Sequence, residues 1–383
     1  MSFWESGAAS MRVIPISDCR PGMRLAKPIY NEDGVVLLAE HVELTEMMIR
    51  RLEKIGFLFL YIEDPRTDDL VIPEMISMET QIRAVGEVRN QFRRLMNQGI
   101  QRTYVRREFF GSAFRDVVSM LIDDLSRQKH GMIMLTNLCI TDHYLYQHSI
   151  NVCIYATILG MAYGYPREEL LTLGMGALLH DIGKTQISQE LILRPGKLTN
   201  EEIEQMKLHT EYGFRILKDE PNISLTVAHC AYQHHERIDG SGYPRGLLGG
   251  DIHEYARWIG LVDSYDAMTT NRVYRSAMLP HQALESLFVD AGKLYDFKMV
   301  EMLRDRLAVY PIGSEVTLNT GEKGIVVDLN ASAPQRPIVR ILTDAEGKEL
   351  SDPYEVDLSR KLSLMVTSVN GVKIKPNNKM AAI

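Results

Sequence analysis

The stretch LGMGALLHDIGK, residues 173–184, sets a histidine and an aspartate at the end of a small, apolar run. The apolar run predicts a buried helix, and His180 and Asp181 would lie at its end. Imidazole and carboxylate groups are ligands of divalent cations. A histidine–aspartate pair alone is weak evidence for a metal site, because such pairs often arise by chance.

Five further ligands of the same kind lie in four other segments, each predicted to be an amphipathic helix. They are His148, His209, His234, His235 and Asp263. None of these candidate ligands is a cysteine, which argues against a structural zinc site. The mixed set of imidazoles and carboxylates suits Fe, Mn, Zn, Ni or Co. A doubled site of this kind can hold two cations bridged by one carboxylate, which stabilises the attacking and leaving oxygens of a phosphoryl displacement. The constellation therefore predicts a two-metal phosphohydrolase.

The other histidines are interpreted as packing or surface residues, because a lone histidine is more often structural than a ligand. They are His41, His130, His143, His229, His253 and His281. Cys230 lies four residues before His234 on the same helical face, and it is interpreted as a small core residue.

Composition describes an ordinary globular chain. Its 383 residues suggest two or three domains, and 45% hydrophobic with 24% charged residues is usual for such proteins. A net charge of −7 gives no indication of duplex nucleic-acid binding, although a metal centre would still attract a nucleotide. The four cysteines show no paired spacing, no apolar run approaches the ~20 residues of a membrane helix, and the start lacks a signal-peptide pattern. We expect a cytoplasmic protein without membrane partners.

Hydrophobic periodicity divides the chain into four segments, and the expected fold class is mainly α. Residues 1–64 form a small α+β module, 65–130 a helical linker, 131–308 an all-helical catalytic domain, and 309–383 a small β-rich module with a loose tail. Helices are expected over 142–163, 167–181, 200–218, 222–236, 254–270 and 280–307. In the linker, residues 82–95 carry an apolar stripe, which is interpreted as packing within the chain. Alternatively, the stripe is a coiled-coil seam, which would make the protein a homodimer.

A glycine-rich loop follows the histidine pair, in residues 234–247 (HHERIDGSGYPRGL). Its glycines permit backbone to approach a bound phosphate or ion closely. Tyr243 offers a ring for stacking or hydrogen bonding, and Pro244 stiffens the turn. Such loops are structural as often as functional, but the adjacent ligands favour an active-site wall.

These motifs together resemble the HD-GYP family of bacterial cyclic di-GMP phosphodiesterases, a branch of the HD-domain metal phosphohydrolases. The matching stretches are residues 148–152 (HSINV), 180–184 (HDIGK), 195–199 (PGKLT) through His209, 234–247, and 263–272 (DSYDAMTTNR). They cover about 140–280, less than half of the chain. The resemblance implies an all-helical HD-type core that hydrolyses cyclic di-GMP to pGpG, and further to GMP in some cases, in second-messenger signalling.

The resemblance also implies roles for individual residues. Asp181 would bridge two divalent ions, with Fe or Mn favoured and Zn, Ni or Co as alternatives. His148, His180 and Asp263 would complete the ligands of one ion, and His209, His234 and His235 those of the other. Lys184 would stabilise phosphate charge, and Arg272, Arg275 and Tyr243 would bind the substrate.

One position departs from part of the family. Members with three metals carry a glutamate four residues before the first histidine ligand, where this chain has Tyr144. A dinuclear centre is therefore expected. Two alternatives stay open: an HD phosphohydrolase of another nucleotide or mixed cyclic dinucleotide, and a non-catalytic receptor of cyclic dinucleotides.

Overall fold

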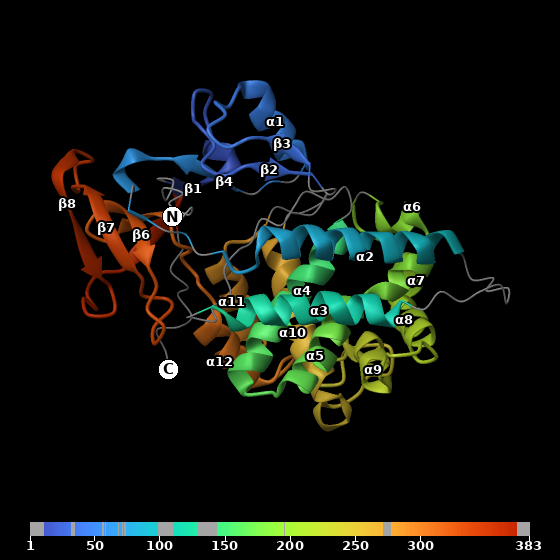
Figure 1. Cartoon of the computed structure of the whole chain (residues 1–383). Helices are drawn as coiled ribbons and strands as arrows, with labels where there is room; N and C mark the ends of the chain where they lie inside the picture. The colour runs from blue at the N-terminus through green and yellow to red at the C-terminus, as the bar shows by residue number, and fades with distance from the viewer. Residues whose placement is uncertain are drawn as a thin grey trace, which may run out of the picture. The chain divides into compact units, whose positions relative to one another are not determined.

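The computed structural model describes residues 11–31, 35–55, 57, 59–67, 69–70, 72, 74–98, 110–128, 144–194, 196–270 and 277–373 (Figure 1). The chain forms two compact units. One comprises residues 1–31, 35–74 and 307–383, and the other comprises 32–34 and 75–306. The first unit is built from both ends of the chain, and the second contains all predicted metal ligands.

The N-terminal part of the first unit is a small α+β arrangement, as expected. Strand β1 (Met11–Pro15) pairs antiparallel with β4 (Phe59–Glu63), and β2 (Ile29–Tyr30) pairs with β3 (Val36–Leu38). Helix α1 (Glu46–Ile55) buries Ile49 and Leu52. These elements agree with the α+β character expected for this segment.

The C-terminal part of the first unit is a six-stranded antiparallel sheet in the order β10-β9-β5-β6-β7-β8. Its strands are β5 (Glu315–Leu318), β6 (Lys323–Asp328), β7 (Ile338–Thr343), β8 (Glu349–Asp357), β9 (Val366–Val369) and β10 (Val372–Lys373). Val316, Ile325, Val339 and Ile341 are almost completely buried and form its core. The predicted β-rich module is confirmed.

Ion pairs join the two ends of the chain within this unit. Arg12 on β1 pairs with Asp64 at 3.0 Å and with Glu315 on β5 at 3.4 Å. Arg340 on β7 contacts both carboxylate oxygens of Asp69, at 2.6 and 2.7 Å. The four-segment division stays a prediction, but these contacts place its first and last segments in one folded unit.

The second unit is helical throughout its described residues. Its elements are α2 (Met78–Gln98), α3 (Gly111–Ser126), α4 (Tyr144–Tyr163), α5 (Arg167–Leu179), η3 (Ile182–Gln186), α6 (Gln189–Ile192), α7 (Asn200–Lys207), α8 (His209–Leu217), α9 (Leu225–Gln233), η4 (Gly249–Asp251), α10 (Glu254–Thr269), α11 (Pro280–Val289) and α12 (Phe297–Arg306). Helix α4 packs against α5 and α10, and α8 packs against α9 and η3. The expectation of a mainly α protein is confirmed.

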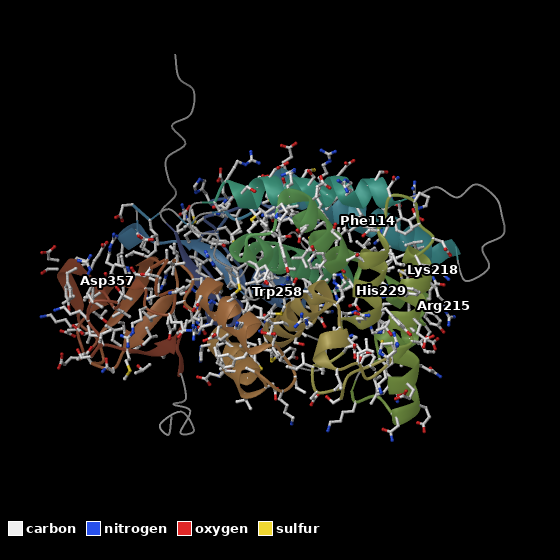
Figure 2. The ribbon with its side chains drawn as sticks, turned by 90° about the horizontal axis from the view of Figure 1, so that it is seen from below. Phe114, Arg215, Lys218, His229, Trp258 and Asp357 are labelled. Atoms are coloured by element: carbon white, nitrogen blue, oxygen red, sulfur yellow. The ribbon has the colours of Figure 1, made fainter. Side chains whose placement is uncertain are left out.

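The apolar stripe of α2 packs inside this unit. Val85, Val88 and Phe92 are fully buried, and the Phe92 ring makes edge contacts with Phe114 of α3 and Tyr146 of α4. Trp258 of α10 is likewise fully buried among the helices (Figure 2). The interpretation of the stripe as intramolecular packing is confirmed.

Carboxylates from elsewhere in the unit cap two helices. Glu220 accepts hydrogen bonds from the backbone N–H of Phe110 and Gly111, at 2.7 and 3.4 Å, where α3 begins. Asp124 accepts from the N–H and hydroxyl of Ser77, at 2.9 and 2.8 Å, just before α2. Each bond satisfies a donor at a helix N-terminus, where negative charge is also favourable.

Two predicted helices are divided in the structure. The helix expected over 200–218 breaks at Leu208 into α7 and α8, and the helix expected over 280–307 breaks between Val289 and Phe297. The second break contains Gly292 at φ +77°, a backbone conformation that ends a helix readily. Thr199 and Glu202 form a capping box at the start of α7.

No helix within the described ranges is long and apolar enough to span a bilayer. Cys19, Cys153 and Cys230 are buried free thiols, and Cys139 lies outside the described residues. Cys230 packs in the core beside Gly176, which agrees with its interpretation as a core residue.

Candidate metal centre

The end of α5 carries His180 and Asp181 into the interior. Nine of the ten residues from Leu170 to Leu179 are buried, all except Thr172, and His180 and Asp181 are at most 1% exposed. The following short helix η3 lies directly against α8, which begins at His209. The buried apolar helix thus delivers two polar side chains to a position beside a third.

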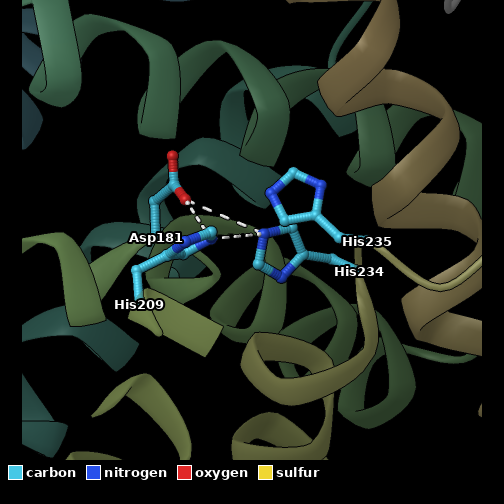
Figure 3. Close-up of side chains that lie close together, drawn as sticks. All are labelled: Asp181, His209, His234 and His235. Carbon is cyan, nitrogen blue, oxygen red and sulfur yellow. Dashed lines mark hydrogen bonds and ion pairs between the residues drawn. The ribbon is translucent and has the colours of Figure 1, made fainter. Parts of the chain in front are cut away.

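Asp181, His209, His234 and His235 form one cluster that could hold a metal ion (Figure 3). Asp181 Oδ1 lies 3.4 Å from His209 Nε2 and 3.7 Å from His234 Nε2. The Nε2 atoms of His209 and His234 are 3.4 Å apart. Four potential ligand atoms from three separate segments therefore converge on one point.

His148, His180 and Asp263 form a second cluster of the same kind. His148 Nε2 lies 3.1 Å from Asp263 Oδ1 and 3.3 Å from His180 Nε2. His148 comes from α4 and Asp263 from α10, so these ligands also lie on helices distant in sequence. The seven predicted metal ligands thus fall into two clusters.

Asp181 lies between the clusters and faces each with a different oxygen. Its Oδ2 lies 3.4 Å from His180 Nε2 and 3.6 Å from His148 Nε2, whereas Oδ1 faces His209 and His234. Oδ1 is buried and has no hydrogen-bond partner among the described residues. A buried, unsatisfied carboxylate oxygen facing imidazole nitrogens is costly without a cation, so the donor set fits divalent metal.

Backbone carbonyls orient three of the imidazoles toward the centre. The Nδ1 atoms of His180, His209 and His234 lie 2.7, 2.6 and 3.0 Å from carbonyl oxygens three residues earlier in the chain. A donated Nδ1–H fixes the tautomer in which Nε2 carries the free lone pair. The three Nε2 atoms that face the carboxylates are therefore available as ligands.

Burial sets the protonation of the cluster in favour of metal binding. It lowers the pKa of His209 to about 4 and the pKa values of His234 and His235 well below their usual range. Burial opposes ionisation of Asp181, but the charges of Lys184 and His180 hold the pKa of that carboxyl well below its usual range. Neutral imidazole and ionised carboxylate are the forms that coordinate cations.

Two parts of the chain match known domain families. Residues 132–299 match a model described as an HD domain, and residues 315–374 match one described as a KOW domain associated with HD domain. Residues 132–299 are thus an HD domain. The HD domain coincides with most of the helical unit, and the KOW domain coincides with the six-stranded sheet. HD-domain phosphohydrolases bind divalent metals, which agrees with the two clusters.

Curated relatives of the HD domain have named activities. A cyclic di-GMP phosphodiesterase of Pseudomonas aeruginosa is 32% identical over 246 residues, which are 63% of this chain and 59% of that protein. One of Thermotoga maritima is 45% identical over 126 residues, 33% of this chain and 34% of that protein. A 3'3'-cGAMP-specific phosphodiesterase of Vibrio cholerae is 35% identical over 157 residues, 41% of this chain and 30% of that protein. The matches thus span between 30% and 59% of these relatives, and the predicted resemblance to HD-GYP proteins is confirmed.

Of the other predicted site residues, Lys184 and Tyr243 lie beside the clusters. Lys184 is about one-fifth exposed, and its Nζ donates to Asp181 Oδ2 at 2.5 Å. Tyr243 stacks on His235, with ring centroids 4.7 Å apart and an interplanar angle of 28°. Arg272 and Arg275 lie outside the described residues, as does the side chain of Tyr144.

Sequence reasoning missed Asp266, which contacts the predicted metal ligand His148. Asp266 Oδ2 lies 2.7 Å from His148 Nδ1, and its Oδ1 accepts from Asn151 Nδ2 at 2.8 Å. Burial alone would lower the pKa of His148, but hydrogen bonds to Asp263 and Asp266 raise it to about 9. The available signal was helical spacing, because Asp266 follows Asp263 by three residues and Asn151 follows His148 by three.

Replacing Asp266 with asparagine is expected to weaken metal binding by about 10- to 100-fold, the range for residues that orient a histidine ligand. The variant keeps the side-chain size but removes the charge that favours the His148 Nδ1–H tautomer. Competition with a chelator measures the change in affinity. Asp116→Asn, at an exposed position on α3, is the matched control, and equal affinities of the two variants would contradict the role of Asp266.

Proposed function

We propose that this chain is a metal-dependent phosphodiesterase that hydrolyses cyclic di-GMP to pGpG, and further to GMP, in bacterial second-messenger signalling. The observation that carries the proposal is the shared position of Asp181 between two buried ligand clusters. We also propose that the protein acts in the cytoplasm. A homodimer through a coiled-coil seam is not proposed, because the apolar stripe of α2 packs within the helical unit.

The proposed cofactor is a pair of divalent cations, Fe or Mn, with Zn, Ni or Co as alternatives. Asp181 would bridge them through its two oxygens. His148, His180 and Asp263 would complete one ligand set, and His209, His234 and His235 the other. When bound, such a pair supplies a nucleophilic water at neutral pH and neutralises charge on phosphate oxygens.

Residues around the centre support the handling of a phosphodiester. Lys184 places an ammonium group beside Asp181 at the partly exposed edge of the cluster, where it would stabilise charge on the non-bridging oxygens. Tyr243 lies against His235 and would form a wall of the substrate site. Arg272 and Arg275 would bind the second phosphate, and this role rests on the family resemblance.

The relatives support two different cyclic dinucleotides as substrates. The relatives from Pseudomonas and Thermotoga are named for cyclic di-GMP, whereas the Vibrio relative is named for 3'3'-cGAMP. Cyclic di-GMP is favoured because the match with the highest identity of the three carries that name. A mixed cyclic dinucleotide is the second candidate.

The test is turnover by protein reconstituted anaerobically with Fe²⁺ or Mn²⁺. We expect pGpG from cyclic di-GMP, slower turnover of 3'3'-cGAMP, and no turnover of mononucleotides, measured by chromatography of the products. Removal of metal with a chelator should abolish the activity. Metal-replete protein that cleaves none of these compounds would contradict the proposal, and binding without cleavage would favour a receptor.

A further inference from the structure

Glu236 follows the histidine pair directly, and its side chain binds the backbone nine and eleven residues later in the chain. Its side chain is buried, with 5% exposed. Its Oε1 accepts a hydrogen bond from the backbone N–H of Arg245 at 2.8 Å, and its Oε2 accepts one from Leu247 at 2.9 Å. Both oxygens are thus used to close residues 236–247 into a loop. Hydrogen bonds from backbone amides to a carboxylate are among the stronger ones in proteins.

The closed loop brings Tyr243 onto a metal-ligand candidate. The Tyr243 ring stacks on His235, and the Tyr243 N–H donates to the carbonyl of His235 at 3.2 Å. Lys207 places its ammonium group 5.4 Å from the centroid of the same ring. The position of Tyr243 over the centre therefore depends on how the loop is closed.

Gly242 shows how closely the loop lies against the turn that carries the ligands. A Cβ at this position would lie 2.4 Å from the nitrogen of Arg237 and 2.5 Å from the carbonyl oxygen of His235. Only glycine permits this approach, because those neighbours are backbone atoms. A loop released at Arg245 and Leu247 would lose the support that presses Tyr243 toward His235.

The ligand turn has a separate anchor that does not involve Glu236. Arg237 donates from Nη1 to the carbonyl of His234 at 3.1 Å and from Nη2 to the hydroxyl of Ser264 at 3.4 Å. Glu236 itself belongs to neither metal-ligand cluster within the described chain. Loss of the Glu236 bonds should therefore release the loop while leaving the metal ligands in place.

We propose that Glu236 is a positioning residue, which fixes Tyr243 as a wall of the substrate site and thereby sets substrate affinity. This inference rests on the phosphodiesterase function proposed above. The Glu236 side chain acts through the backbone of the loop, by its hydrogen bonds to Arg245 and Leu247.

The test compares Glu236→Gln and Glu236→Ala in the metal-loaded full-length protein. Glutamine keeps the volume and one acceptor oxygen, but it presents an N–H₂ group to the second backbone donor, whereas alanine loses both acceptors. We expect KM for cyclic di-GMP to rise roughly tenfold in the glutamine variant and further in alanine, with kcat within about threefold of wild type. Glu190→Gln, at an exposed position on α6, should change neither constant.

Two readouts separate this inference from the function on which it rests. Hydrogen exchange at the amides of Arg245 and Leu247 should accelerate in the variants, and metal content should stay at the wild-type level. Loss of metal, a fall in kcat with unchanged KM, or unchanged exchange in both variants would overturn the inference. A wild-type protein without turnover, combined with faster exchange in the variants, would refute the phosphodiesterase function and still support the fixing of the loop by Glu236.

Discussion

Replacing Asp181 with alanine is expected to remove both the bound metal and the phosphodiesterase activity. Asp181 lies between the two clusters, with Oδ2 facing His148 and His180 and Oδ1 facing His209 and His234. Its loss would leave each cluster with three ligands and no shared anion to offset the repulsion between two cations. Losing about 4 kcal/mol of charge stabilisation corresponds to a fall in rate of roughly 10³-fold.

Metal analysis and turnover of the same preparation measure this prediction. Asp116→Ala is the matched control, because Asp116 is an exposed carboxylate on α3 of the same unit. The control should keep the metal content and rate of the wild type. An Asp181→Ala protein with a full complement of metal would show that the centre is held in another way.

The ligand set was predictable because its members are chemically distinctive. Imidazoles are rare, and five of them with two aspartates lie in segments whose apolar periodicity predicts burial. The convergence of these segments was predictable only through the family resemblance, because periodicity shows which face of a helix is buried and not which helix it meets. The structure supplies that part: His148 and Asp263 lie 115 positions apart in the chain and 3.1 Å apart in space.

The supporting residues could not be recognised in the same way. Asp266 and Glu236 are carboxylates of a kind that usually faces solvent, and their spacing from neighbouring ligands does not show what they contact. Their roles arise from contacts with Asn151 and Leu247, at other places in the chain. Tertiary packing, which a single sequence does not display, decides these roles.

The sequence of strand β8 does not indicate a strand, for a different reason. Its sequence ELSDPYEVD is charged and contains Pro353, and its residues are exposed or half-buried along the whole strand. It lies at the edge of the sheet, where a proline is tolerated and no buried face imposes alternation. The period-2 pattern on which strand prediction depends is therefore absent.

Replacing Gly183 with alanine is expected to destabilise the HD domain and to disrupt the metal centre together. A Cβ at Gly183 would lie 1.8 Å from the carbonyl oxygen of His209 and 2.5 Å from the nitrogen of Gly213. Both neighbours are backbone atoms of α8, so no side-chain rotation relieves the clash, and η3 must move away from α8. Asp181 precedes η3 and His209 begins α8, so this movement would pull apart a pair of ligands now 3.4 Å apart.

We expect a loss of about 3 kcal/mol or more in the free energy of unfolding, as for a strongly overpacked site. For a unit of this size that corresponds to a fall in Tm of roughly 6–12 °C. Gly86→Ala is the matched control, because Gly86 lies within α2 and a Cβ there meets nothing within 4 Å. The control should gain about 0.4–1 kcal/mol, since alanine restricts the unfolded chain. If Gly183→Ala kept the Tm and metal content of the control, then η3 and α8 would not be in the close contact that brings Asp181 to His209.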